Sequence, residues 1–175
     1  MGDYARAIAD HTQAISLQPD FAGAYYARGE AHYNQRDYQR GIADLSQAIT
    51  LALEFIGAHS LRGHAYIRIE DYSRAVVDHD WVIEHGPYEP AAYNNRCWSY
   101  FKACEYKQAL PDCEKALALA PDYVNALDSR ARVYMALGRT EGAIFDFERT
   151  IELGLDPELS RQAAAELSEQ TSSEG

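Results

Sequence analysis

Apolar, aromatic and acidic positions recur along the chain at a fixed interval. Tyr38 follows Tyr4 by 34 residues, and two further tyrosines follow at the same spacing. An apolar column consists of Ile8, Ile42, Val76, Leu110 and Ile144, and an acidic column consists of Asp10, Asp44, Asp78, Asp112 and Asp146. Several columns in phase indicate an internal repeat, and a period of roughly 20 to 50 residues is typical of stacked arrays.

Each repeat contains two helical stretches. The pattern predicts first helices near residues 22–35, 56–69, 90–103 and 124–137, and second helices near 38–52, 72–85, 106–119 and 140–153. Pro90 stands at a helix start, where its missing N–H costs nothing, and Gly138 ends a first helix. Pro111 falls inside a second helix, so we expect a local kink there.

These residues resemble the tetratricopeptide repeat, a helix-turn-helix unit of 34 residues. The third full unit carries the residues of that pattern at Tyr93, Cys97, Tyr100, Ala109, Cys113 and Pro121. The chain departs from the pattern at an arginine that replaces the usual leucine in every full unit, at His32, and at Leu53 and Leu155, which stand where prolines stand elsewhere. The resemblance implies an all-α fold, a right-handed α-solenoid of antiparallel helix pairs.

The repeats predict a domain plan for the whole chain. We expect a half repeat with only a second helix at 1–19, full repeats at 22–55, 56–89, 90–123 and 124–157, a capping helix at 158–169 and a disordered tail at 170–175. The sequence starts in mid-repeat. Its first helix is therefore either an N-terminal cap or part of a longer array, and an upstream leader stays open.

Charge and cysteine content narrow the class of protein. The net charge is -11, with 27 acidic against 16 basic residues, which argues against nucleic-acid binding because phosphate contacts need clustered Lys and Arg. No apolar run is long enough to span a membrane. Three cysteines in one unit do not resemble a secreted disulfide framework, so we expect a cytoplasmic, reducing location. Cys97 and Cys113 occupy packing columns and are interpreted as small buried hydrophobes.

A basic column accompanies the acidic one. It consists of Arg28, Arg62, Arg96 and Arg130. Arg28 lies 16 residues before Asp44 and 18 after Asp10, so each arginine could meet the aspartate of the following or the preceding second helix. A pair that recurs in every unit follows the scaffold and not one site, so we expect these pairs to be structural.

The resemblance also implies a binding surface, because one face of the first helices lines a concave groove in tetratricopeptide proteins. The groove positions of this chain are Tyr26, Glu30, Tyr33, His64, Ile67, Arg68, Asn94, Trp98, Phe101, Lys102, Arg132 and Met135. Aromatic and apolar members match the composition of interface hot spots, and Arg68, Lys102 and Arg132 add positive charge to an acidic protein. Packing and binding remain equally open for Tyr33 and Phe101, whereas Trp98 favours binding.

The family's clamp for a chaperone's C-terminal carboxylate is absent. Its Lys, Asn, Asn, Lys and Arg are replaced in the first three units by Tyr26, Glu30, Leu61, Ala91 and Asn95, and in the last three by Ser60, His64, Asn95, Asn125 and Ser129. We therefore do not expect a chaperone-tail adaptor of the usual form.

Candidate catalytic groups are few. Asp78, His79 and Asp80 are consecutive, but successive helix residues point about 100° apart and cannot converge on one metal or proton. His11 and His79 share a packing column, which favours buried or half-buried histidines. No phosphate loop or zinc motif is present in the sequence. We predict a protein without enzymatic activity, cofactor or metal.

Two functions remain after this exclusion. The first is a protein-interaction scaffold that binds a peptide or partner helix in the groove, with a ligand that carries an acidic group or a C-terminal carboxylate and bulky apolar side chains. The alternative is an assembly segment, either of a longer repeat protein or of a self-associating array, that docks through the exposed N-terminal helix.

Overall fold

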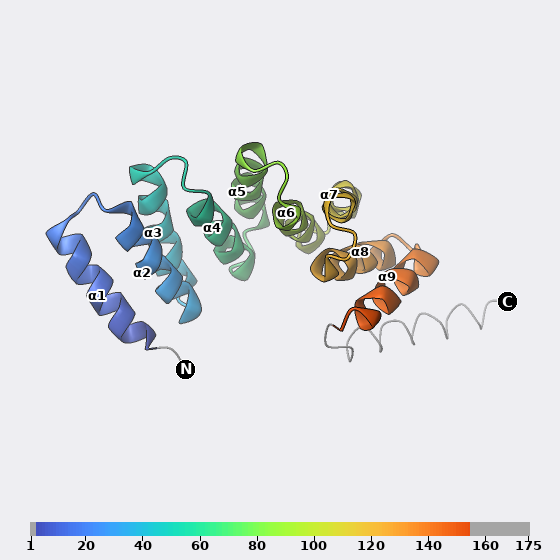
Figure 1. Ribbon diagram of the computed structural model, residues 1–175, viewed down its shortest axis with the longest axis horizontal. Helices are drawn as coiled ribbons and strands as arrows, with labels where there is room; N and C mark the ends of the chain where they lie inside the picture. Colours follow the sequence, from blue (N-terminus) through green and yellow to red (C-terminus); the bar gives the residue numbers. More distant parts are fainter. Residues whose placement is uncertain (1–2, 155–175) are drawn as a thin grey trace. The chain divides into compact units, whose positions relative to one another are not determined.

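The computed structural model describes residues 3–154, and within them the chain is helical, without strands. Within each of the two compact units described below, successive helices lie side by side and antiparallel (Figure 1). Their bounds are α1 Tyr4–Leu17, α2 Ala22–Asn34, α3 Tyr38–Leu51, α4 Ile56–Arg68, α5 Tyr72–His85, α6 Pro90–Lys102, α7 Tyr106–Leu119, α8 Val124–Ala136 and α9 Thr140–Glu152.

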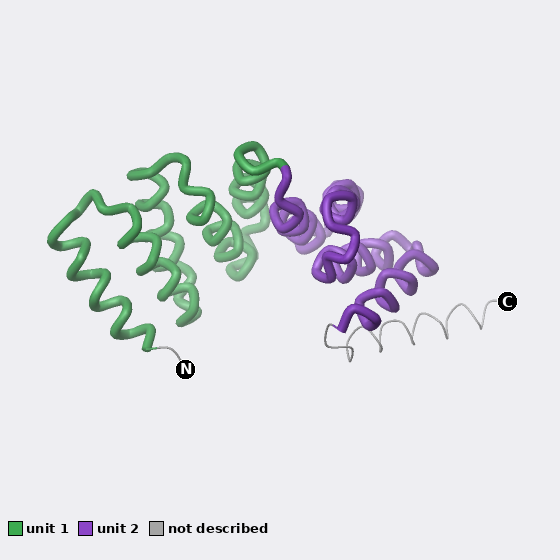
Figure 2. The backbone as a smooth tube through the Cα atoms, viewed as in Figure 1, with its two compact units in different colours: residues 1–87 green, residues 88–175 purple. Residues whose placement is uncertain are grey.

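The chain divides into two compact units, residues 1–87 and 88–175 (Figure 2). The first unit holds α1 to α5, and the second holds α6 to α9. The boundary falls between the repeats expected at 56–89 and 90–123, a division that the sequence pattern does not indicate.

Helix positions agree with the expected ones to within one residue, because the 34-residue pattern fixes both helices of each repeat. The expected capping helix at 158–169 and tail at 170–175 lie outside the described residues. α7 continues through Pro111 without interruption. Among the described residues, no helix has the length and apolar character needed to cross a membrane.

The turn between the two helices of a repeat has a left-handed residue at the same position each time. Arg36, Glu70, Cys104 and Gly138 have φ values of 65°, 62°, 61° and 71°. Gly138 fits this conformation without steric conflict, whereas a side chain costs about 1 kcal/mol or more there. The repeat therefore tolerates local strain in three turns to keep the two helices antiparallel.

Close packing within a repeat depends on a small residue in the first helix. A Cβ atom on Gly29 would lie 2.9 Å from Leu45 Cγ, and one on Gly63 would lie 2.5 Å from His79 Nε2. Leu45 and His79 are both fully buried. His79 therefore occupies a core position, as the packing column predicts, and the glycine makes room for it.

Paired charges join the two helices of each repeat in the first unit. Arg28 donates from Nε and Nη2 to Asp44 at 2.8 and 2.7 Å, and Arg62 donates likewise to Asp78 at 2.9 and 2.7 Å. A third donor reaches back to the preceding second helix, since Arg28 Nη1 lies 3.1 Å from Thr12 Oγ1. One arginine thus links three helices.

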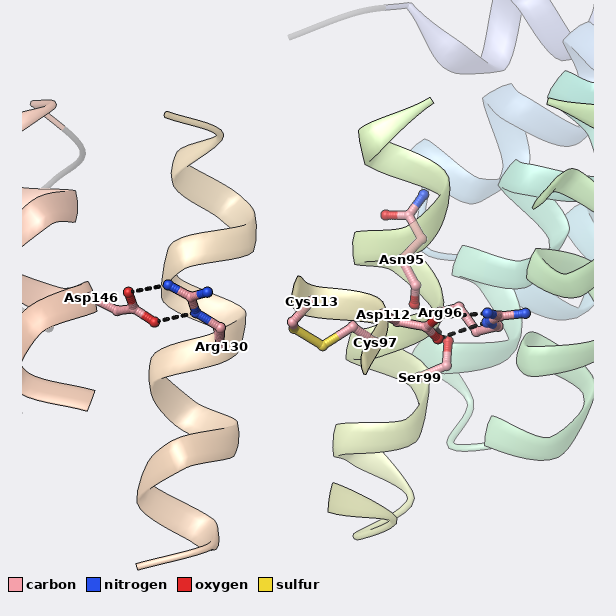
Figure 3. Close-up of a disulfide and its surroundings, with 8 residues drawn as sticks. All are labelled: Asn95, Arg96, Cys97, Ser99, Asp112, Cys113, Arg130 and Asp146. Carbon is pink, nitrogen blue, oxygen red and sulfur yellow. Dashed lines mark hydrogen bonds and ion pairs between the residues drawn. A yellow bond between two sulfur atoms is a disulfide. The ribbon is translucent and has the colours of Figure 1, made fainter. Parts of the chain in front are cut away.

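The same pair recurs in the second unit (Figure 3). Arg96 donates to Asp112 at 2.7 and 2.6 Å, and Arg130 donates to Asp146 at 2.7 Å through both nitrogens. The hydrogen bond to Asp146 raises the pKa of the Arg130 guanidinium, against the opposing effect of burial. The predicted structural role of the arginine column is confirmed, and in each case the partner is the aspartate of the following second helix.

Cys97 and Cys113 form a disulfide between α6 and α7, which corrects the expectation of two free thiols (Figure 3). Both residues are fully buried, as predicted. They occupy the facing positions that hold a glycine and a large side chain in the first unit, and their Cα atoms are 5.5 Å apart, within the range a disulfide spans. The cysteines therefore no longer favour a reducing location.

Removing one partner of a buried pair is expected to destabilise the second unit strongly. Asp146 is fully buried, so Arg130→Ala leaves its charge uncompensated and should lower the free energy of unfolding by about 3 to 5 kcal/mol. The exposed Lys107→Ala variant should change it by less than about 0.5 kcal/mol. Urea unfolding measures both. The apolar double variant Arg130→Met with Asp146→Leu should recover most of the loss, and a loss as large as in the single variant would contradict this account.

Reduction of the Cys97–Cys113 disulfide is expected to destabilise the chain. The bridge joins residues 16 apart in sequence, and a loop of about that length corresponds to about 3 kcal/mol in the chain-entropy model. Urea unfolding with and without reductant should differ by this amount in a Cys104→Ser background, which prevents thiol exchange. The Cys97→Ala, Cys113→Ala variant should not respond to reductant. Equal unfolding of fully reduced and oxidised chains would refute the prediction.

Candidate partner-binding faces

The first helices form the inner layer of each unit. α2 contacts α4, and α6 contacts α8, whereas no contact of comparable extent joins α3 to α5 or α7 to α9 in the described part of the chain. The first helices therefore crowd together on one side of each unit. The sequence-predicted groove residues lie on these helices, and we call them the α2–α4 face (Tyr26, Glu30, Tyr33, His64, Ile67, Arg68) and the α6–α8 face (Asn94, Trp98, Phe101, Lys102, Arg132, Met135).

An aromatic and cationic cluster occupies one end of the α2–α4 face. The ring centroids of Tyr33 and Tyr38 are 5.4 Å apart in an edge-on arrangement, and the guanidinium of Arg68 lies 5.4 Å from the Tyr38 centroid. Burial raises the pKa of Tyr33, and the nearby charge of Arg68 opposes that rise. Arg68 is exposed and has no carboxylate partner among the described residues. It remains available to an anionic group.

The other end of this face is occupied by packing contacts. The Tyr26 ring stacks on Phe55 with centroids 4.8 Å apart, and both rings pack against the core formed by Leu45, Ala48 and Ala58. Burial, followed by the charge of Glu30, raises the pKa of Tyr26. Tyr26 is therefore held in the junction between two repeats.

The remaining members of the α2–α4 face differ in exposure. Glu30 is exposed, and Ile67 is half-buried. His64 is half-buried with its ring 5.6 Å from the ring of His79. A ligand on this face would contact Arg68, Ile67 and Glu30 before it contacted the packed ring of Tyr26.

A row of aromatic rings crosses the α6–α8 face. Trp98 stacks on Phe101 with centroids 5.2 Å apart, and Phe101 lies 5.7 Å from Tyr106. Phe101 and Tyr106 pack against the core around Cys97 and Cys113. Trp98 is half-buried, like Phe101 and Tyr106, but it is not among the residues that pack against this core. Phe101 thus joins Trp98 to the core.

Charged groups on the α6–α8 face are arranged differently from the sequence expectation. Arg132 donates to Asp128 on its own helix at 2.8 and 3.0 Å, so its charge is already compensated. Lys102 is exposed and has no partner among the described residues. Lys102 is thus the uncompensated cation of this face.

Two uncharged side chains complete the α6–α8 face. Asn94 is 7% exposed, and its Oδ1 accepts no hydrogen bond. A buried oxygen without a donor is costly, and because this oxygen is itself buried, Asn94 belongs to the packed side of α6. Met135 is 39% exposed and adds a flexible apolar side chain.

Two residues of these clusters were not predicted as part of the groove, and one ion pair on it was not predicted. Tyr38 and Tyr106 begin second helices, yet they support the first-helix faces. Their signal was the tyrosine column itself, which keeps the 34-residue spacing from Tyr4. Asp128 stands four residues before Arg132, a spacing at which opposite charges meet on a helix.

Other features of the surface do not coincide with these faces. An open hollow of about 590 Å³ lies at the α8–α9 turn and is lined by Tyr134, Arg139 and Glu141, among others. Another of about 480 Å³ is lined by Leu117, Phe145 and Arg149 of the second helices, with Leu127 and Arg130 of α8. Within residues 3–154, no group of three or more His, Cys, Asp or Glu side chains could hold a metal ion.

Family models match the chain where the helix pairs lie. Tetratricopeptide-repeat models match residues 22–55 and 90–123, and a further TPR repeat model matches residues 1–35. The chain is a tetratricopeptide-repeat protein. Its all-α solenoid fold is that of the family, as the resemblance in the sequence implied. The sequence matches no curated protein significantly.

Solved tetratricopeptide structures share this fold. MamA from Desulfovibrio magneticus RS-1 is 19% identical with a TM-score of 0.73, over 87% of this chain and 96% of that chain. YrrB, described as a TPR protein with an unusual peptide-binding site, is 18% identical with a TM-score of 0.78, over 92% and 83%. The first TPR of RPAP3, bound to the HSP90 peptide SRMEEVD, is 26% identical with a TM-score of 0.64, over 67% and 93%.

The two stacked aromatics of the α6–α8 face are expected to differ in their effect on stability. Phe101 packs against the buried core, so Phe101→Ala should lower the free energy of unfolding by about 2 kcal/mol. Trp98→Ala removes a ring that does not pack against that core and should cost less than about 1 kcal/mol. Urea unfolding of both variants measures the difference. An equal or larger loss for Trp98→Ala would assign Trp98 to packing.

Proposed function

We propose that this chain is a protein-interaction scaffold that binds a peptide or partner helix on the faces of its first helices. The observation that carries the proposal is the half-buried Trp98, stacked on Phe101 and close in sequence to the unpartnered Lys102. Tryptophan and neighbouring aromatics are enriched at residues that dominate binding energy. The peptide complex of RPAP3 and the peptide-binding site described for YrrB support the same use of the fold.

The chemistry that we propose for the ligand is based on the α6–α8 face. Asn94, Trp98 and Lys102 follow one another at intervals of four residues, so they form one line along α6. A bulky apolar side chain would cover Trp98, and a carboxylate would pair with Lys102. The ligand is therefore an extended or helical segment with an apolar residue close to an acidic one.

The α2–α4 face offers a second contact of the same chemistry. Arg68 is exposed beside the Tyr33 and Tyr38 rings, and Ile67 precedes it. An acidic residue of the ligand would meet Arg68, and an apolar one would meet the adjacent rings. The chaperone-tail clamp positions hold Tyr26, Glu30, Leu61, Ala91 and Asn95, so the proposed contact does not use that clamp.

The test is selection from a phage-displayed library of random 12-residue peptides against the full chain. Selected peptides should carry an aromatic or aliphatic residue close to Asp, Glu or the C-terminal carboxylate. Trp98→Ala should weaken their binding by about 30-fold, the effect of losing an interface hot spot. Lys102→Ala should weaken it less and make it less dependent on salt.

A matched control keeps this test specific. Lys115 is an exposed lysine of α7, on a second helix, so Lys115→Ala should leave peptide affinity unchanged. Fluorescence anisotropy with a labelled peptide gives the dissociation constants. Failure to enrich any peptide, or enrichment of peptides that bind the Trp98→Ala and Lys102→Ala variants equally well, would overturn the proposed function.

A further inference from the structure

Cysteine is confined to one repeat of the chain. Cys97, Cys104 and Cys113 all lie within residues 90–123, and residues 1–87 contain none. The Cys97–Cys113 disulfide joins α6 to α7, whereas Cys104 is an exposed free thiol at the turn between them. A change in the thiol state of the chain therefore acts directly on this repeat and not on the first compact unit.

The repeat fold does not require a disulfide at this position. The bidentate ion pair is present in all four full repeats, and here it joins Arg96 to Asp112. The other full repeats fill the two facing positions with non-bonded pairs, which are Gly29 and Leu45, Gly63 and His79, and Ala131 and Phe147. The disulfide is therefore an addition to one repeat, and its effect depends on what packs around it.

The aromatic row of the α6–α8 face rests on this disulfide. Both cysteines are fully buried in a core cluster with Ala109, Leu110 and Val133. Phe101 and Tyr106 pack against that cluster, and the ring centroids of Phe101 and Trp98 are 5.2 Å apart. Trp98 also follows Cys97 directly in α6. The disulfide thus holds both the helix that carries Trp98 and the ring on which Trp98 stacks.

Reduction removes this constraint. One thiolate of a dithiol reductant attacks a sulfur of the bridge and forms a mixed disulfide, which the second thiolate then cleaves. Two electrons and two protons pass to Cys97 and Cys113, which become thiols, and the reductant becomes a cyclic disulfide. Two thiols keep their sulfur atoms at van der Waals separation, so a close-packed core must rearrange to hold them. Phe101 and Tyr106 pack against the cluster that rearranges.

We propose that the Cys97–Cys113 disulfide is a redox switch for ligand binding on the α6–α8 face. The oxidised chain holds the row of Trp98, Phe101 and Tyr106 in one arrangement, so a ligand binds without first ordering it. Reduction by a dithiol loosens the row, and the ligand loses affinity. This inference rests on the proposed peptide binding of that face. The α2–α4 face keeps its contacts in both states, because its unit contains no cysteine.

The first test follows the Trp98 ring and needs no ligand. It uses a Trp81→Phe, Cys104→Ser chain, in which Trp98 is the remaining tryptophan and no free thiol can exchange with the bridge. Reduction with dithiothreitol should raise the rate constant for acrylamide quenching of the fluorescence about twofold, because the row opens locally. The helical signal in circular dichroism should stay unchanged. Equal quenching in both states would overturn the proposal, as would loss of the helical signal, because the disulfide would then hold the whole unit together.

A matched control copies the facing residues of the next repeat. Cys97→Ala with Cys113→Phe reproduces the contact between Ala131 and Phe147, so the space is filled without sulfur. Added to the Trp81→Phe, Cys104→Ser chain, this pair of substitutions should give the same quenching with and without dithiothreitol. A response of this variant to the reductant would contradict the proposal, because the effect would not come from the disulfide.

The second test measures binding of a labelled 12-residue peptide selected on the oxidised chain. Fluorescence anisotropy should give a dissociation constant about tenfold higher for the reduced Cys104→Ser chain than for the oxidised one. Linkage makes the effect reciprocal, so saturating peptide should raise the ratio of reduced to oxidised dithiothreitol at half-reduction by the same factor. Equal affinities would overturn this inference alone, whereas failure to enrich any peptide would overturn both it and the proposed function.

Discussion

The bidentate ion pair between a first-helix arginine and a second-helix aspartate is the interaction on which the repeats depend. Each pair lies where the two helices meet, and the aspartates are at most 7% exposed. A buried pair adds little net stability compared with apolar side chains, but it penalises any register in which one charge loses its partner. Its value is therefore specificity: only the antiparallel alignment that brings residues 16 apart together satisfies both groups.

Because the ion pair fixes the helix register, the positions beside it can differ from one repeat to the next. Beside each pair, the facing positions hold glycine and leucine, glycine and histidine, two cysteines, or alanine and phenylalanine. These pairs of residues differ in chemistry but fill the same space. The repeat at 90–123 has a disulfide there, whereas the other repeats have a small residue packed against a large one. Variation at the faces of the first helices is freer still, because Trp98 and Lys102 have no counterpart in the packing of the repeat.

Periodicity made the helices and their pairing predictable, because each position was sampled four or five times in one sequence. The sequence left two partners open for Arg28, namely Asp10 of the preceding second helix and Asp44 of the following one. The structure selects Asp44. The disulfide had the same 16-residue spacing and could have been recognised from it. It was missed because an odd cysteine count and an expected reducing location outweighed the spacing. Comparing the same position in successive repeats does not reveal contacts within one helix. The ion pair between Asp128 and Arg132 was therefore overlooked.

The division between packing and binding residues follows from the same repeat logic. Phe101 and Tyr26 contact buried clusters, so their rings belong to the scaffold, whereas Trp98 and Lys102 do not contribute to those clusters. Asn94 is buried and belongs to the scaffold, although its Oδ1 accepts no hydrogen bond. Trp98 and Lys102 are outside the buried clusters, and a side chain that gains little from the fold is most simply explained by what it contacts outside it.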